Sequence, residues 1–309
     1  MKKQYLNSVL AVGALLLAGC NSEEVENLGN QPEVLPDGRV EVMFAAGGGG
    51  LEEIDGTRAS WSSSYDANIG ISAYTEDGNQ IFNGYSNVEY RSRHSNDSGW
   101  SFYPASTGIY YSADANERIR FSAYYPYQDL AGGNIFKVDL TGNFSETDEL
   151  LWAGITSDSY NKESSTVPLN LTRQYSTIRI LLRNGGGYES SDTQGATLTI
   201  SDMPVKADFN VTTGECTVTE TADMIFEDLG ISAGWYVYIL PTEAKTGRVV
   251  TVTLKSGESY TWDISDKAFQ SGYFYEYHLR VNKTGSSFNL TIEDRENDIM
   301  GSYENIDLR

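Results

Sequence analysis

Short runs of alternating apolar and polar residues, separated by Gly, Asn, Asp and Ser, recur along most of this chain. The alternate apolar positions are Val40, Val42 and Phe44; Ile119, Phe121, Ala123 and Tyr125; Ile178, Ile180 and Leu182; Trp235, Val237 and Ile239; Val250, Val252 and Leu254; Tyr273, Tyr275, Tyr277, Leu279 and Val281; and Phe288, Leu290 and Ile292. A period of two places such side chains on one face of a strand, and no long stretch has the 3.6-residue period of a helix. The pattern therefore predicts an all-β protein built from antiparallel sheets, each with one buried face.

The strand pattern also predicts how the chain divides into domains. Residues 39–309 are too many for one ordinary sandwich core, and strand signals thin out between Gly154 and Val167. We therefore expect an N-terminal β-sandwich domain over 39–167. A C-terminal β-sandwich domain with a polar tail is expected over 168–309, and in both domains the sheets should pack face to face.

The N-terminus has the three parts of a secretory signal. Lys2 and Lys3 precede an apolar stretch from Val9 to Leu17, which is about half of the roughly 20 residues that a bilayer-spanning helix needs. The following Leu17-Ala18-Gly19-Cys20 resembles a lipobox, so residues 1–19 are expected to be removed and Cys20 to become the acylated first residue. The alternative is an ordinary signal with an incidental cysteine. Residues 20–38, which are acidic and contain two prolines, are predicted to form a tether between an outer-membrane lipid anchor and the first domain.

Charge and cysteine content exclude several classes of protein. The chain has 22 Lys and Arg against 43 Asp and Glu, a formal net charge of −21, so its surface repels phosphates and nucleic-acid binding is rejected. Lipidation of Cys20 leaves Cys216 without an intramolecular partner, so no disulfide framework is expected. Because Cys216 lies in an alternating stretch, it is interpreted as a small buried side chain and not as a reactive thiol.

A search for catalytic and metal-binding motifs is negative. The two histidines, His94 and His278, have no further ligand at metal-site spacing, and no nucleophile elbow, phosphate loop or dinucleotide fingerprint is present. We therefore predict neither a catalytic residue, nor a metal site, nor a cofactor. A pair of carboxylates across a cleft would suffice for a glycosidase, so a hydrolase is kept as a distant third hypothesis.

Aromatic residues provide the second hypothesis. They make up 12% of the chain, with 21 Tyr and 5 Trp, and exposed aromatic rings can stack on sugars. The chain would then be a surface lipoprotein that binds glycans without polymerising. Alternation such as Tyr273-x-Tyr275-x-Tyr277 instead favours tyrosines that pack on a half-buried sheet.

Several segments, in this order along the chain, resemble the fimbrillin family, the subunits of type V pili of Bacteroidales. They are the lipobox; Val40-Glu41-Val42-Met43-Phe44 and a loop ending in Gly56-Thr57-Arg58-Ala59; Asn68-Ile69-Gly70-Ile71-Ser72-Ala73-Tyr74; Ile119-Arg120-Phe121-Ser122-Ala123-Tyr124-Tyr125-Pro126-Tyr127; Leu169-Asn170-Leu171 through Tyr175-Ser176-Thr177-Ile178-Arg179-Ile180; and Gly272-Tyr273-Phe274-Tyr275. The resemblance covers most of the mature chain. It implies two tandem transthyretin-like β-sandwich domains, export as a lipoprotein and assembly into a fimbria on the cell surface.

The resemblance also implies a mechanism of assembly. In polymerising members of the family, an arginine-specific protease cuts the loop after the first strand, that strand leaves, and a neighbouring subunit fills the groove with its C-terminal strand. For this chain we predict polymerisation by strand addition at a sheet edge. Arg58 fits the cut site and Ala59 the new N-terminus, whereas the alternative for Arg58 is an ordinary surface arginine. Val40, Val42 and Phe44 would form the displaced strand, and their burial would contribute about 5 to 9 kcal/mol.

The C-terminal tail departs from the family pattern. It is strongly polar, with Ile306 and Leu308 as its candidate groove-filling side chains, so it either acts as a donor strand or folds back as in a tip or accessory subunit. The leading hypothesis is a non-enzymatic pilus subunit or pilus-tip adhesin. Its expected partners are other pilus subunits, an arginine-specific protease, the outer membrane and a receptor on a host or bacterial surface.

Overall fold

The computed structural model describes most of the chain after the tether. The described ranges are 31–46, 68–95, 99–142, 149–164, 166–184, 193–227, 235–284 and 287–297. Every strand lies in the compact unit Pro32–Arg309. Within the described ranges all regular structure longer than one turn is β-strand, which confirms the all-β prediction.

The strands that precede residue 174, apart from β8, form one long sheet and one short one. The long sheet has the order β10-β2-β5-β4-β3-β7-β9-β11, and the short one pairs β1 with β6. Their bounds are β1 Val40–Glu41, β2 Phe44–Ala46, β3 Asn68–Thr75, β4 Val88–Ser95, β5 Gly99–Pro104, β6 Tyr110–Tyr111, β7 Ile119–Tyr125, β9 Leu151–Ala153, β10 Val167–Leu169 and β11 Thr172–Arg173. The hydrogen-bonded path is thus continuous through eight strands, where the sequence predicts two separate sheets.

Two neighbouring inner strands of this sheet, β3 and β7, are buried on both faces and pair in register from Gly70↔Tyr124 to Thr75↔Ile119. Gly70 is required there by close packing, because a Cβ at this position would lie 2.4 Å from Cε1 of Tyr124. The apolar side chains of β2, β3 and β7 share one core, which contains Phe44, Ile71 and Phe121.

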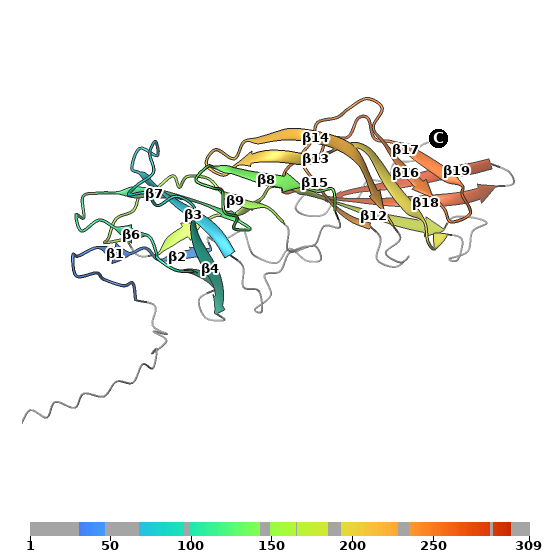
Figure 1. The fold of residues 1–309 in the computed structure, drawn as a ribbon. Coiled ribbons are helices and arrows are strands. Elements are labelled where there is room, and N and C mark those ends of the chain that lie inside the picture. Colours follow the sequence, from blue (N-terminus) through green and yellow to red (C-terminus); the bar gives the residue numbers. More distant parts are fainter. Residues whose placement is uncertain are drawn as a thin grey trace, which may run out of the picture. The chain divides into compact units, whose positions relative to one another are not determined.

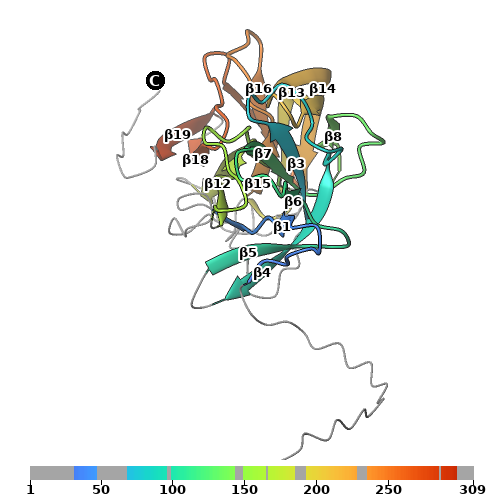
Figure 2. The same cartoon turned by 90° about the vertical axis from the view of Figure 1, so that its left-hand side faces the viewer.

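The later strands form two sheets. Their orders are β15-β12-β18-β19 and β14-β13-β16-β17, with β8 added to β13. Their bounds are β8 Ile135–Asp139, β12 Ser176–Asn184, β13 Thr197–Asn210, β14 Cys216–Phe226, β15 Trp235–Ile239, β16 Val249–Thr253, β17 Ser259–Asp263, β18 Phe274–Thr284 and β19 Ser287–Asn297. Ile178 and Tyr277 from the first sheet and Leu198 and Val252 from the second belong to one apolar core, and Figure 2 shows the two groups of strands on either side of it.

The two cores are connected by strands that pair with the sheet of the other half of the chain. β8 leaves the strand run of the first sheet and pairs with β13 over Lys206↔Asp139 to Asn210↔Ile135, where Figure 1 shows it beside β13. In the other direction, β10 and β11 return to the first sheet, where β11 pairs with β9. Pro168, the predicted start of the second domain, lies inside β10. The division at 167/168 stays a prediction, and strand pairing crosses it both ways.

Candidate functional site

The predicted displaced first strand, Val40 to Phe44, lies in a segment that continues to Ala46 in the structure. Val42 and Phe44 are each only 1% exposed and belong to the first core, whereas Val40 is half-buried. The prediction of three buried residues is therefore wrong for Val40. The segment is also two short strands, because the chain changes partners at Val42 and Met43. The burial of two large side chains, at roughly 1.5 to 3 kcal/mol each, contributes about 3 to 6 kcal/mol.

Backbone hydrogen bonds hold the segment on more than one side. Val40 pairs with Tyr111 of β6, and the Val42 N–H donates to Ile109 O at 2.9 Å. Phe44 pairs with Phe102 of β5 in antiparallel and with Val167 of β10 in parallel orientation. The expected edge location is thus wrong: β2 lies between β5 and β10, because the chain returns at Val167 and covers its outer side.

The ring of Phe44 fits between two other aromatic rings. It meets Tyr90 of β4 at 5.2 Å and 85° and Phe121 of β7 at 5.0 Å and 86°, both edge to face. Tyr90 and Phe121 are fully buried, and the Tyr90 hydroxyl accepts a hydrogen bond of 2.7 Å from the Ile109 N–H. Edge-to-face pairs contribute about 0.5 to 1.5 kcal/mol each beyond burial. Phe44 is therefore the best-held side chain of the segment.

Two carboxylates flank the start of the segment. Glu41 accepts a hydrogen bond from the Glu33 N–H at 3.4 Å, and the Tyr110 hydroxyl donates to Glu33. Burial raises the pKa of the Glu41 carboxyl, and the negative charge of Glu33 adds to that rise, against the lowering by the Glu33 N–H. At neutral pH the charge on Glu41 therefore weakens the seating of the segment.

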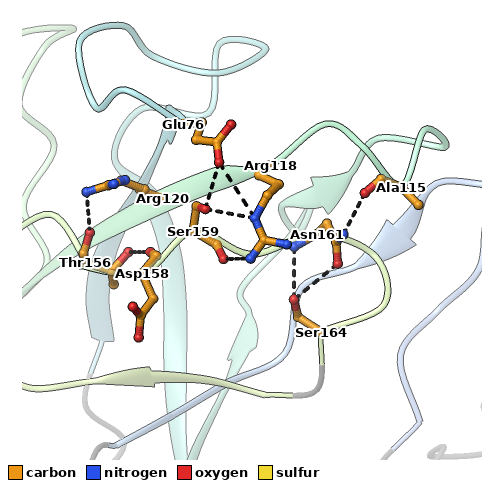
Figure 3. A network of polar contacts seen from close by, with 9 residues as sticks. All are labelled: Glu76, Ala115, Arg118, Arg120, Thr156, Asp158, Ser159, Asn161 and Ser164. Carbon is orange, nitrogen blue, oxygen red and sulfur yellow. Dashed lines mark hydrogen bonds and ion pairs between the residues drawn. The ribbon is translucent and has the colours of Figure 1, made fainter.

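A polar network, drawn in Figure 3, holds the neighbours of the segment in place. Asn161 Nδ2 donates to Ala115 O at 2.6 Å, and its Oδ1 accepts the Glu163 N–H at 3.1 Å. Arg118 Nε donates to Ser159 Oγ at 2.8 Å. These bonds tie residues 112–118, which follow β6, to residues 156–164, which lead into β10. None of these side-chain bonds uses Val40 to Ala46, although the ladder partner of β10 is β2 and that of β6 is β1.

The other predicted site residues lie outside the described residues. They are the lipidation site Cys20, the cut site Arg58 with Ala59, and the candidate donor residues Ile306 and Leu308. Of the predicted set, the structure thus brings together Val42 and Phe44. Sequence reasoning missed their partners Tyr90, Ile109 and Val167, whose signal was limited to their being aromatic or aliphatic residues.

The prediction that Cys216 is a small buried side chain is wrong. Cys216 is exposed at the start of β14, an edge strand whose first six residues are all exposed. Alternation there does not indicate burial, because this end of β14 has no covering layer.

The described side chains offer few surface aromatics and no metal cluster. Each described Tyr, Trp and Phe side chain is buried or half-buried, which weakens the hypothesis of aromatic platforms for sugars. Within the described ranges there is also no group of three or more His, Cys, Asp or Glu that could hold a metal ion. In the same ranges no helix has the length and apolar character needed to cross a bilayer.

Fold and site together define a class: an all-β protein in which a short N-terminal segment lies between two strands of a sheet. The chain belongs to the fimbrillin-like family, whose model matches residues 57–294. The resemblance seen in the sequence is therefore confirmed.

Individual relatives agree with this assignment. The protein named "Putative fimbrium subunit Fim1C" of Bacteroides uniformis is 29% identical over 305 residues, which are 95% of each chain. The crystal structure of a protein titled "putative cell adhesion protein", also from Bacteroides uniformis, matches with a TM-score of 0.67 at 27% identity and covers 83% of this chain and 98% of that one. A second structure with that title, from Bacteroides ovatus, has a TM-score of 0.59 at 19% identity over 82% and 97% of the two chains, a similarity of fold alone.

Proposed function

We propose that this protein is a non-enzymatic subunit of a cell-surface pilus, exported as a lipoprotein and assembled by protease-triggered strand exchange. The observation that carries the proposal is the seating of Val42 and Phe44, both 1% exposed, in a segment that precedes Arg58 in the sequence. Membership of the fimbrillin-like family and similarity to a named fimbrium subunit support the pilus assignment.

Because β2 lies between β5 and β10, the exchange proposed here is insertion into an internal slot and not the predicted addition at a sheet edge. Departure of β2 would leave a gap between β5 and β10, which a strand from another subunit could fill with hydrogen bonds on both sides. The buried side chains and the ladders on both sides make spontaneous departure rare while the segment is covalently linked to the body. Cutting at Arg58 would let the released fragment diffuse away, so proteolysis is the natural trigger.

Limited proteolysis tests this proposal. An arginine-specific protease should make one early cut, after Arg58, and yield a body that begins at Ala59 by N-terminal mass spectrometry. Arg58→Ala should abolish that cut, while Arg39→Ala, which removes a half-buried arginine beside the segment, should leave it unchanged. Early cutting at other arginines, with Arg58 intact, would argue against the proposed maturation.

Anchoring is tested at Cys20. Mass spectrometry of membrane-bound protein should find residues 1–19 absent and the N-terminal cysteine acylated, and Cys20→Ser should release the protein from the membrane fraction. An unmodified Cys20 in the membrane-bound form would contradict lipidation.

The finer fold assignment is also a proposal. We infer that the chain follows the tandem transthyretin-like sandwich plan, which is supported by the core shared between the two later sheets. The continuous eight-stranded sheet around Phe44 departs from a plain sandwich of two separate sheets.

A further inference from the structure

The slot proposed above holds the ring of Phe44 in an aromatic box, and this box bears on which strand can replace the segment. Its walls come from β4 and β7: Tyr90 lies edge to face with Phe44, and Phe121 does so from the other strand. Neither wall belongs to the departing segment. Phe121 is held further by Tyr111 at 6.3 Å and Tyr160 at 6.1 Å, and Tyr90 by its bond from Ile109. Both rings of the box therefore stay with the body when the segment leaves, although Ile109 and Tyr111 lose their backbone partners Val42 and Val40.

The register of the strand in the slot is fixed by the backbone. Ile109 O accepts the Val42 N–H at 2.9 Å, and Met43 O accepts the Val167 N–H at 2.8 Å. These two bonds, from opposite sides, set a buried aliphatic residue two positions from the residue in the box. The side chain of Met43, which lies between Val42 and Phe44 in the sequence, is half-buried, so a charge there would lose much of its hydration.

We propose that the slot selects a donor strand with three consecutive residues of fixed kind: an aliphatic residue, an uncharged residue and Phe. This strand is supplied by a different subunit and not by the tail of a second copy of this chain. This inference rests on the proposed strand exchange. Residues 298–309 contain no Phe. Their aliphatic pair with the required spacing is Ile306 and Leu308, and in either direction this pair puts Asp307 at the position of Met43.

Both mismatches act against self-assembly. Leu in the box lacks the ring edges that meet Tyr90 and Phe121, and the close-packed walls cannot collapse onto a smaller side chain. Tyr303, the aromatic residue of the tail, would bury its hydroxyl between the two rings. Ile306 and Leu308 are thereby left for the groove of a different subunit, and the chain is expected to assemble into mixed polymers.

Peptide exchange tests the selection. Full-length protein cut to completion at Arg58 is mixed, in urea below the unfolding transition, with an excess of labelled peptides. The peptides are residues 38–46, the same peptide with Phe44→Leu, the same with Met43→Asp, and residues 298–309. We expect the native peptide to bind at least about tenfold more tightly than the Leu or the Asp variant, and we expect the tail peptide not to bind. A tenfold difference corresponds to about 1.4 kcal/mol, which the loss of two ring contacts can supply in the Leu variant.

A variant of the protein gives a reciprocal measurement. In the cut chain, Phe44→Leu should speed the release of the N-terminal fragment about tenfold, while Val34→Ala, at a side chain 63% exposed, should leave the rate within about twofold. Binding of the tail peptide within twofold of the native peptide would overturn the selection while leaving strand exchange intact. If the fragment stays bound and no peptide enters, the native one included, the strand exchange itself fails and the selection with it.

Discussion

At the residue scale, the buried face of the first segment is reduced to two anchors. Val40, Val42 and Phe44 have the same spacing and similar hydrophobicity, yet the core takes up Val42 and Phe44 and leaves Val40 half-buried. The difference arises because Val40 pairs with the two-residue strand β6, whereas Phe44 enters the long sheet. Most of the seating energy is therefore expected at Phe44.

Glu41 provides a pH test of the seating. Its folded-state pKa is raised, so the folded state holds the proton more tightly, and the cost of the charge is present above the folded pKa and absent below the ordinary value. Glu41→Gln removes that cost. We expect the variant to be more stable than the wild type at pH 7, by thermal unfolding, and the difference to shrink as the pH falls through the folded pKa of Glu41.

A matched control for this effect is Glu117→Gln, an exposed carboxylate in the same half of the chain. It should not reproduce the pH-dependent gain. Equal stability of wild type and Glu41→Gln across the whole pH range would show that burial of Glu41 costs nothing.

At the scale of elements, the strands beside the slot are held by side-chain bonds more than by their own length. β6 has two residues and β10 has three, and each is followed or preceded by a segment clamped through Asn161 and Arg118. Short ladders alone have little stability. The network in Figure 3 is therefore expected to preserve the slot once the segment departs.

Asn161→Ala tests this clamp. The change removes the bonds to Ala115 and Glu163, and leaving such groups unsatisfied in a partly buried site costs about 1 to 3 kcal/mol. Hydrogen exchange should speed up over residues 112–118 and 160–167 and remain slow in β3 and β7. Asn116→Ala, at an exposed asparagine bonded to the nearby Asp114, is the control that should change neither region.

At the scale of the whole molecule, the two cores are coupled. Trp152 of β9 donates from Nε1 to Val211 O at 2.8 Å, and its ring meets Phe209 of β13 at 6.1 Å. Together with β8, which joins β13, this contact ties the first sheet to the second half. We therefore expect a single cooperative unfolding transition for the folded part of the chain.

Gly214→Ala tests that coupling. Gly214 has φ of +75°, and a Cβ there would lie 2.5 Å from the Trp152 ring, so the change adds backbone strain of about 1 to 2 kcal/mol and overpacking of about 1 to 3 kcal/mol. Urea unfolding should show a total loss of about 2 to 5 kcal/mol and a separation of the transition into two.

Gly247→Ala serves as its control, because Gly247 has φ of +84° but no atom within 4 Å of the added Cβ. This variant should lose only the stability that backbone strain costs, and it should keep a single unfolding transition. Equal losses in the two variants would mean that the contact between Trp152 and the turn at Gly214 contributes nothing.

Much of the fold was predictable from local pattern, and the failures have physical causes. The alternating runs at Ile178, Trp235 and Val250 lie in strands β12, β15 and β16. The longest strand, β13, was not predicted, because register shifts between Ile200 and Met203 and again after Pro204 interrupt its alternation. A bulge moves later side chains to the other face, so a strict period of two misses such strands.

The sequence by itself determined the all-β class, the family and the three alternating candidates Val40, Val42 and Phe44, because alternation and side-chain size act locally. Only the tertiary structure decided which strands border the first segment, since the parallel return at Val167 and the transfer of β8 to β13 join residues far apart in the chain. The same holds for the box around Phe44. Tyr90 and Phe121 become its walls through packing between strands, which no local pattern encodes.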